Sequence, residues 1–410
     1  MNKLTLFAVL VCSALVSCRS TSRGQLGQAD GGLALTSPRD NTLRQLAPPV
    51  NDRALVVEED AGEERPGSAT DELYALAGRR LLAKMPKVSS KLREALSLQR
   101  DLLLRQDPNH VYYVANRELT TKDFLQVIDR LLHDSTGTFV PEAVPVAREG
   151  EVKFTAYFSP DLPASRVRTK RFAYPLLSAP ADDSLRRRTR AQLTAAYADS
   201  SDAHVLAWVS HPLDVYLMQL QGSGYVTYRD GQREYLGFDR SNGHAFTPAA
   251  RALASSDFDV SYRDIRRIRA WMAENLGERA RVIEACENYV YFRRSDTAPM
   301  GAGSVELSPM ISVAADPAHY PLGAVLLAEV PSPRKSGVRE TRILLVQDVG
   351  AAIKGKGRLD LYTGIGRPAL DVARLTSHVG EVYMLAPQRS VEDLLASVST
   401  RSLAARSGVL

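Results

Sequence analysis

The pattern of hydrophobic and polar positions predicts a mainly β chain with a helical lead-in. Apolar residues recur every three or four positions in three early stretches, which predicts helices over Glu72–Met85, Ser89–Arg105 and Thr121–His133. The same spacing returns in the Arg-rich stretch Asp183–Ala198 and in Tyr262–Leu276. We expect most of the sequence after residue 150 to form strands.

Short runs rich in β-branched and aromatic residues predict strands in two groups. The first group comprises Lys153–Phe158, Val205–Val209, Val215–Gln221, Tyr225–Tyr228 and Glu234–Phe238. The second comprises Met310–Ala315, Ala324–Val330, Thr341–Gln347 and Val382–Leu385. Asp230-Gly231 between two of these runs indicates a tight hairpin. Two groups of strands and a length of 410 residues suggest two β-rich domains.

The first eighteen residues have the pattern of a secretory signal that ends in a lipid-modified cysteine. The apolar run Leu4–Val16 is too short to span a bilayer and fits the core of a signal peptide. Leu15–Cys18 resembles a bacterial lipobox, so we expect removal of residues 1–17 and lipidation of Cys18. An ordinary signal with an incidental cysteine is the alternative. Arg19 resembles outer-membrane sorting in Gram-negative bacteria, which predicts an outer membrane lipoprotein facing the periplasm.

Residues 18–70 are rich in small, charged and Pro residues and show no lasting period, which predicts a disordered tether. About fifty flexible residues have an r.m.s. reach of about 40 Å. An element of an N-terminal domain is the alternative.

Composition excludes several classes of protein. Hydrophobic residues at 44% and charged residues at 24% exclude a wholly disordered chain, a collagen and a polytopic membrane protein. A net charge of +5 is too small and too spread out to indicate a nucleic-acid partner, although it suits an anionic polymer or lipid surface. Of the three cysteines, Cys12 leaves with the signal and Cys18 carries lipid, so Cys286 has no intramolecular partner.

No motif for a metal or cofactor is present. The seven His residues include no close-spaced pair of the kind that binds zinc. The stretch Gly350–Lys356 approaches a P-loop, but Gly357 stands where Ser or Thr must hold Mg²⁺. We therefore expect neither a metal nor a cofactor.

Three aspartates in the second β group are candidates for acid–base chemistry. Asp316 precedes Pro317, Asp348 closes a predicted strand, and Asp360 follows twelve residues later. A carboxylate at a strand end beside Gly-rich loops is well placed to act on a polymer. The alternative is that all three cap turns through local backbone N–H groups.

Several ordered motifs resemble the membrane-bound lytic murein transglycosylase A family with its C-terminal three-aspartate (3D) domain. The motifs are Phe154–Pro160, Gln221–Gly224, Ser241–His244, Asn288–Arg293, Val313–Pro317, Pro321–Gly323, Gln347–Gly355 and Leu359–Tyr362. They span roughly Phe154 to Pro387, about half of the chain.

The resemblance implies a double-psi β-barrel domain with an inserted second β-barrel-like domain and a groove between them. It assigns residues 80–161 and 289–390 to the barrel and 162–288 to the insert, which leaves 391–410 as a C-terminal tail. It also implies non-hydrolytic cleavage of the β-1,4 bond between N-acetylmuramic acid and N-acetylglucosamine, by an exotransglycosylase that leaves 1,6-anhydro ends.

The resemblance further implies the roles of individual residues. Asp360 matches the aspartate that acts first as acid and then as base, and Asp348 matches one that orients the site and raises the proton affinity of Asp360. The residues expected to bind substrate are Gln221, Ser223, Tyr157, Asn242 and Asp316. The position of Asp316 beside Pro317 also favours a structural role in a turn, and capping or simple packing is the alternative for Gln221 and Tyr157.

Two features of this chain bear on the expected acid. Lys354, Lys356 and Arg358 lie close in sequence, and nearby cations lower the pKa of a carboxyl. Asp360 must therefore be desolvated, or those side chains must point away. The chain also has Ala351 and Phe158 where the family usually has Gly and Tyr.

The expected partners are peptidoglycan glycan strands and the outer membrane through the lipid anchor, and a complex for cell-wall synthesis or division is a further candidate. A non-catalytic, expansin-like peptidoglycan-binding lipoprotein is the alternative function, because double-psi barrels also occur in expansin-like proteins. A hydrolase that leaves reducing ends is a third reading.

Overall fold

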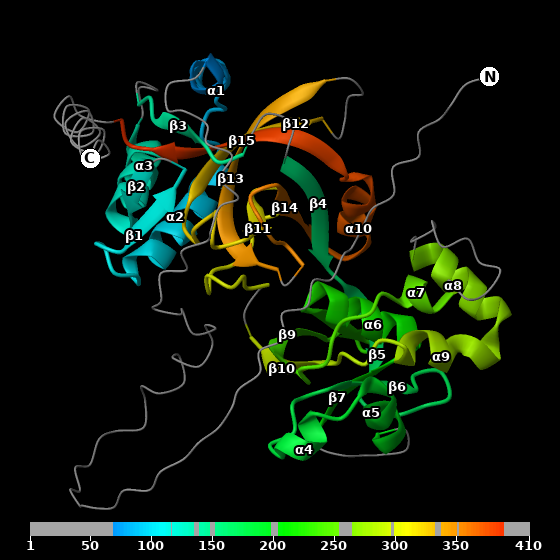
Figure 1. Ribbon diagram of the computed structural model, residues 1–410. Helices are drawn as coiled ribbons and strands as arrows, with labels where there is room; N and C mark the ends of the chain where they lie inside the picture. Colours follow the sequence, from blue (N-terminus) through cyan, green and yellow to red (C-terminus); the bar gives the residue numbers. More distant parts are fainter. Residues whose placement is uncertain are drawn as a thin grey trace, which may run out of the picture.

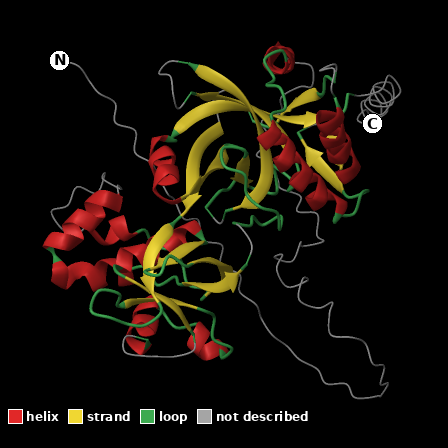
Figure 2. Cartoon of the chain, turned by 180° about the vertical axis from the view of Figure 1, so that it is seen from behind, coloured by secondary structure: helices red, strands yellow, loops and turns green. Residues whose placement is uncertain are grey.

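A computed structural model describes residues 69–388, except residues 116, 135–138, 148–151, 198–203, 254–264, 297–298, 333–337 and 351. The expected signal, Cys18, the expected tether up to residue 68, Ala351 and the tail 391–410 lie outside the described residues, whereas residues 69 and 70 begin a helix. No helix in the described part is long and apolar enough to cross a membrane. The described chain forms two β-rich lobes, seen from opposite sides in Figures 1 and 2.

The larger lobe is built around a closed barrel of six strands in the order β12-β13-β11-β14-β4-β15, with β12 pairing β15 to close it. The strands are β4 (Val152–Ser159), β11 (Ser312–Ala315), β12 (Val325–Pro331), β13 (Arg339–Val349), β14 (Arg358–Ile365) and β15 (His378–Ala386). A further strand, β3 (Glu142–Pro145), pairs with β15. The predicted mainly β fold class is therefore confirmed.

Helices cover the barrel, and the three helices predicted in the lead-in are among them. They are α1 (Ala69–Leu82), α2 (Ser90–Leu104), α3 (Thr121–His133) and, near the C-terminal end, α10 (Gly366–Leu375). A hairpin of β1 (Val111–Val114) and β2 (Arg117–Thr120) joins α2 to α3. The side chain of Thr120 and that of Asp123 form a capping box that fixes the start of α3. The apolar faces of α1, α2 and α3 share one core with the barrel strands.

Ion pairs attach α1 to the barrel. Glu329 on β12 and Glu381 on β15 are directly paired across the sheet and are 6% and 4% exposed. Their charges meet cations from α1 and the turn that follows it, since Arg80 lies 3.2 Å from Glu381 and Lys84 lies 3.2 Å from Glu329. Arg339 also binds Glu329 at 3.1 Å. Buried carboxylates require such partners.

The smaller lobe contains a six-stranded sheet in the order β10-β9-β8-β5-β7-β6. Its strands are β5 (Asp161–Ser165), β6 (Tyr174–Leu177), β7 (Val205–Val209), β8 (Gly224–Tyr228), β9 (Arg233–Ser241) and β10 (Val290–Ser295). β10 also contacts β6 and β7, so the sheet is nearly closed. The sheet runs from Asp161 to Ser295, somewhat beyond the expected insert of 162–288.

Short helices surround this second sheet. They are α4 (Asp183–Arg186), α5 (Arg190–Ala196), α6 (Pro212–Gln221), α7 (Ala249–Leu253), α8 (Ile265–Glu274), the 3₁₀ helix η1 (Leu276–Glu278) and α9 (Arg279–Glu284). Helices α6 to α9 enclose a separate apolar cluster that includes Leu213, Met272 and Cys286.

Two predicted elements differ in the structure. The prediction of a strand over Val215–Gln221 was wrong, because this segment belongs to α6. Its start is fixed by the cap from His211 and by Pro212 in the first turn, and Gly222 ends it in a left-handed conformation. The stretch Asp183–Ala198 forms two short helices rather than one, because Asp182 and Thr189 each cap a separate start.

The segment that returns the chain from the insert to the barrel passes close to barrel backbone. A Cβ on Gly301 would lie 2.3 Å from the Gln347 carbonyl oxygen and 2.8 Å from a Leu307 methyl carbon. The next residue, Ala302, donates its N–H to Asp348 at 2.9 Å. Close packing at Gly301 therefore positions a donor for one of the candidate aspartates.

We expect Gly301→Ala to lower the free energy of unfolding by about 1–3 kcal/mol, because the added methyl must displace barrel backbone. Gly237→Ala is the matched control, since a Cβ there meets only ordinary contacts at 3.5 Å or more. Denaturant unfolding followed by circular dichroism measures both variants. Equal stability of the two would contradict the close approach at Gly301.

Candidate active site

Backbone pairing aligns two of the three aspartates across the barrel wall. Ala314 on β11 pairs with Asp348 on β13 on one side and with Asp360 on β14 on the other, and Asp360 pairs with Thr155 on β4. Directly paired residues point to the same face of a sheet. Since strands lie about 4.8 Å apart, the two aspartates are separated by about 10 Å at their Cα atoms. The one residue between Asp348 and Asp360 in this row of paired residues is Ala314, whose side chain is a single methyl group.

Asp360 lies inside a strand rather than at its end, as the third residue of β14. Its Oδ1 accepts a hydrogen bond of 2.5 Å from the Thr155 hydroxyl, which in turn accepts one of 3.2 Å from Arg358. Its Oδ2 has no hydrogen-bond partner among the described residues. One oxygen is thus oriented and the other is available to a ligand.

Burial raises the pKa of Asp360 to about 6. The hydrogen bond from Thr155 and the charge of Arg358 act in the opposite direction, while the negative charge of Asp348 adds a smaller upward contribution. The expected desolvation is therefore present, and it outweighs the effect of Arg358. Burial, more than like charge, makes this carboxyl a proton donor near neutral pH.

Asp348 has a different set of partners. Its Oδ1 accepts hydrogen bonds of 2.9 Å from the N–H groups of Ala302 and Val349, and its Oδ2 accepts one of 2.7 Å from the Tyr157 hydroxyl. Burial raises the pKa of Asp348, and these three hydrogen bonds oppose that rise. Three hydrogen-bond donors to one carboxyl fix its orientation against the neighbouring groups.

The structure places Asp316 apart from this pair, in a turn at the end of β11. Its Oδ1 accepts from Ala318 N at 3.2 Å and its Oδ2 from Gly355 N at 2.7 Å. Both oxygens are engaged by backbone, which fits the structural role that Pro317 suggested. Asp316 holds the loop that leads into β14.

Side chains of the insert approach the same region of the barrel. Gln221, at the end of α6, accepts a hydrogen bond of 3.0 Å from Phe158 N on β4, and its amide nitrogen has no partner among the described residues. The Tyr157 ring lies 5.3 Å from the Tyr362 ring. Gln221 and Tyr157 therefore lie where the two lobes meet.

Further tyrosines of the insert accompany Gln221. The rings of Tyr225 and Tyr235 lie 5.1 Å apart. Burial raises the pKa of Tyr235, while hydrogen bonds from Ser223 and the Met300 backbone lower it, which places Ser223 beside this ring. The pattern had not singled out Tyr225, Tyr235 or Tyr362, because their proximity depends on the meeting of two sheets.

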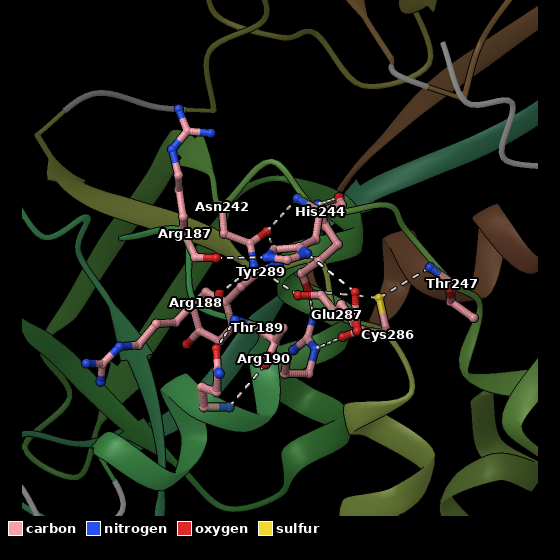
Figure 3. A network of polar contacts seen from close by, with 12 residues as sticks. Arg187, Arg188, Thr189, Arg190, Asn242, His244, Thr247, Cys286, Glu287 and Tyr289 are labelled. Atoms are coloured by element: carbon pink, nitrogen blue, oxygen red, sulfur yellow. Dashed lines mark hydrogen bonds and ion pairs between the residues drawn. The ribbon is translucent and has the colours of Figure 1, made fainter. Parts of the chain in front are cut away.

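Asn242 lies among backbone groups of the insert, and its expected role in substrate binding stays a prediction. It is 4% exposed, and its amide nitrogen donates at 2.9 Å to the carbonyls of both Arg188 and Glu287. Its oxygen accepts from the N–H groups of His244 and Tyr289, so the side chain is fully engaged, as Figure 3 shows. Asn242 joins three segments of the insert.

Thr155 contacts Asp360, Arg358 contacts Thr155, and the sequence did not reveal this arrangement. Arg358 stood out only as a nearby cation, and Thr155 only as part of a motif. Their link to Asp360 depends on the parallel pairing of β14 with β4, which local sequence does not disclose. Within the described residues, no group of three or more His, Cys, Asp or Glu side chains could hold a metal ion.

Family models match both parts of the fold. The model described as the MltA specific insert domain matches residues 153–293, and the 3D domain model matches residues 311–386. A membrane-bound lytic murein transglycosylase A of Vibrio cholerae is 31% identical over 251 residues, which cover 59% of this chain and 67% of that protein. The chain belongs to the membrane-bound lytic murein transglycosylase A family.

Other members of this family show the same relationship. The Escherichia coli K12 protein of that name is 34% identical over 245 residues, covering 58% of this chain and 66% of its own length. The chain thus spans about two thirds of the length of the curated relatives it matches. The two aspartates aligned across β11 lie within the matched 3D domain.

Solved structures of the family resemble this one. A crystal structure of E. coli MltA with bound chitohexaose has a TM-score of 0.54 and 31% identity, covering 58% of this chain and 72% of that one. MltA from Neisseria gonorrhoeae has a TM-score of 0.62 at 21% identity, covering 77% and 92%, which supports the fold alone.

The raised pKa of Asp360 predicts a pH-dependent effect on stability. The folded state binds a proton near pH 6 that the unfolded chain binds only near pH 4, so wild-type stability rises as pH falls through this window. At pH 8 we expect Asp360→Asn to raise the thermal midpoint and to increase the free energy of unfolding by at most roughly 3 kcal/mol. At pH 4 we expect little change in either quantity. Scanning calorimetry at both pH values measures this, with exposed Asp371→Asn as control. A stabilisation that is the same at both pH values would contradict the assignment.

Proposed function

We propose that this chain is a lytic transglycosylase that cleaves the β-1,4 bond between N-acetylmuramic acid and N-acetylglucosamine in peptidoglycan without water. The observation that supports this most directly is Asp360, a desolvated carboxyl with a pKa of about 6 and one oxygen available to a ligand. Membership of the family supports the substrate class, and the chitohexaose bound to the E. coli relative supports a glycan ligand.

The reaction needs only one carboxyl to move protons. Protonated Asp360 donates to the glycosidic oxygen, so the bond from that oxygen to C1 of the muramic residue breaks. The C6 hydroxyl of the same sugar then attacks C1, and the Asp360 carboxylate accepts the hydroxyl proton. The product is a 1,6-anhydro ring, and Asp360 is protonated again. A tethered hydroxyl has a high effective concentration, which replaces the second carboxylate of ordinary glycosidases.

Asp348 acts in this proposal as a positioning residue. It accepts hydrogen bonds from the Tyr157 hydroxyl and the Ala302 N–H. Asp348 therefore fixes the Tyr157 ring and the segment that returns from the insert on one side of the site. Its negative charge adds to the proton affinity of Asp360, although burial contributes more. Thr155 and Arg358 orient the Asp360 carboxyl from the opposite side.

Contacts to the glycan come from both lobes. The free amide nitrogen of Gln221 suits the carbonyl of an N-acetyl group, and Ser223 offers a hydroxyl close by. Tyr157 and Tyr225 offer ring faces and edges to sugars. Because Phe158 N binds Gln221, the backbone of the barrel sets the position of this insert residue.

We further propose that the protein is held at the outer membrane by lipid on Cys18 and faces the periplasm. The names of the relatives describe membrane-bound enzymes. A tether between Cys18 and the described domains leaves the enzyme free to reach nearby glycan strands. A complex for cell-wall synthesis or division is a further partner that this location allows.

We expect Asp360→Asn to lower the rate of glycan cleavage by about 10²–10⁴-fold, because it removes the proton donor. Mass spectrometry of digested peptidoglycan should show 1,6-anhydro ends with the wild type and unchanged material with the variant, while binding to peptidoglycan sacculi persists. Asp371→Asn on the exposed face of α10 is the matched control. Reducing ends in the wild-type products would indicate a hydrolase, and binding without cleavage would indicate the non-catalytic alternative.

Arg358 predicts a shift in the pH profile. Because its charge lowers the pKa of Asp360, we expect Arg358→Gln to move the alkaline limb of kcat/KM to higher pH. Arg358→Lys keeps the charge and should move it less. Rates measured from pH 4 to 9 on one glycan substrate test this. An alkaline limb that is unchanged or shifted to lower pH in Arg358→Gln would rule out the charge effect.

A further inference from the structure

The insert contains a cavity that the proposed reaction does not use. It has a volume of about 220 Å³ and lies among β6, α5, α6, η1 and α9. Its lining includes none of the side chains that contact Asp348 or Asp360. At about 30 Å³ per water, this space would hold about seven waters. It is large enough for one or two small amino-acid residues.

The walls combine apolar side chains with a buried cation. Leu177, Leu193 and Tyr289 are buried and form part of the lining. Exposed residues of the lining, including Ala280, place an opening on the side of η1 and α9. The polar group of greatest interest is Arg190, which also lines the cavity and is only 2% exposed.

Arg190 has no carboxylate partner within salt-bridge distance among the described residues. Its Nε donates to the Cys286 carbonyl at 2.8 Å (Figure 3). Its Nη2 donates to the Asn288 carbonyl at 2.5 Å. The guanidinium lies 5.3 Å from the ring centre of Tyr289, and its Nη1 donates to no described residue. The backbone carbonyls orient this group without neutralising its charge.

A buried charge normally has a partner of opposite sign. The lining of the cavity also includes Arg279 and Glu284, so its formal charge is positive by one. A guanidinium with free N–H groups binds carboxylates well. The cavity therefore suits a small ligand with an apolar body and one carboxylate.

We propose that this cavity binds the carboxylate-terminated end of a short peptide, and specifically a peptide stem of peptidoglycan. The choice of a peptidoglycan stem rests on the proposed function, whereas the carboxylate chemistry rests on Arg190 and the apolar walls. Helix α6 connects the two places, because Pro212 and Val215 line the cavity while Gln221 contacts β4. Pro212 and Gln221 are the two ends of this helix of 10 residues, and the nine rises of about 1.5 Å between them separate them by about 14 Å. A stem of four extended residues covers that span.

Titration calorimetry of the full chain with N-acetyl-D-alanyl-D-alanine tests the ligand class. We expect a dissociation constant of about 1 mM or tighter for a ligand of this size. The C-terminal amide of the same peptide should bind at least tenfold more weakly, because it lacks the charge that Arg190 attracts. Absence of binding up to 10 mM, or equal binding of the amide, would overturn the proposal. Equal binding of butyrate would replace the peptide by a free short-chain acid as the ligand.

Two alanines of α9 and its C-terminal end provide matched variants. Ala280 lines the cavity and Ala285 does not, and both are exposed. We expect Ala280→Trp to weaken binding of the peptide at least tenfold and Ala285→Trp to change it less than twofold. If Ala280→Trp does not fold, Thr194→Phe against Ala195→Phe on α5 makes the same comparison. Equal effects within a pair would place the peptide outside the cavity.

These binding measurements involve no turnover. A wild-type chain that forms 1,6-anhydro ends but binds no peptide would refute only the cavity proposal. A chain that binds the peptide through the cavity but forms no such ends would refute only the proposed function.

Discussion

The site depends on the burial of one carboxyl in a rigid barrel wall. Asp360 lies on the third position of β14, between Ala314 of β11 and Thr155 of β4, so the sheet fixes its backbone on both sides. Desolvation raises its pKa to about 6, and this effect exceeds the opposing influence of Thr155 and Arg358. A carboxyl whose pKa lies near neutral pH can both donate and accept a proton.

The two aspartates differ because their hydrogen bonds differ. Asp348 accepts three hydrogen bonds, whereas Asp360 accepts one, and its second oxygen has no hydrogen-bond partner among the described residues. The barrel places them on either side of a residue with a single methyl group, and the return segment supplies one of the donors to Asp348. The insert then adds Gln221 to the same region through a bond to β4.

Much of the fold was predictable from hydrophobic pattern, because α3 has a strong helical period and β7 is a short continuous apolar run. The pattern over Val215–Gln221 predicted a strand, but the segment is helical. The cap at His211 and the proline in the first turn favour the helix more than the β-branched and aromatic residues favour a strand. Ordered motifs pointed to Asp348 and Asp360 before any geometry was known. The roles of Thr155 and Asn242 were not accessible, because they depend on strand register and on which backbone groups surround a side chain.

The central claim is that burial in the barrel wall makes Asp360 the proton carrier. Carboxyl-carbon NMR titration of the wild-type chain, with the signals assigned through Asp360→Asn and Asp348→Asn, tests it most directly. The account predicts that Asp360 titrates near pH 6 and that the pKa of Asp348 also lies above its ordinary value, because both carboxyls are buried. An Asp360 signal that titrates near the ordinary value of about 4 would contradict it.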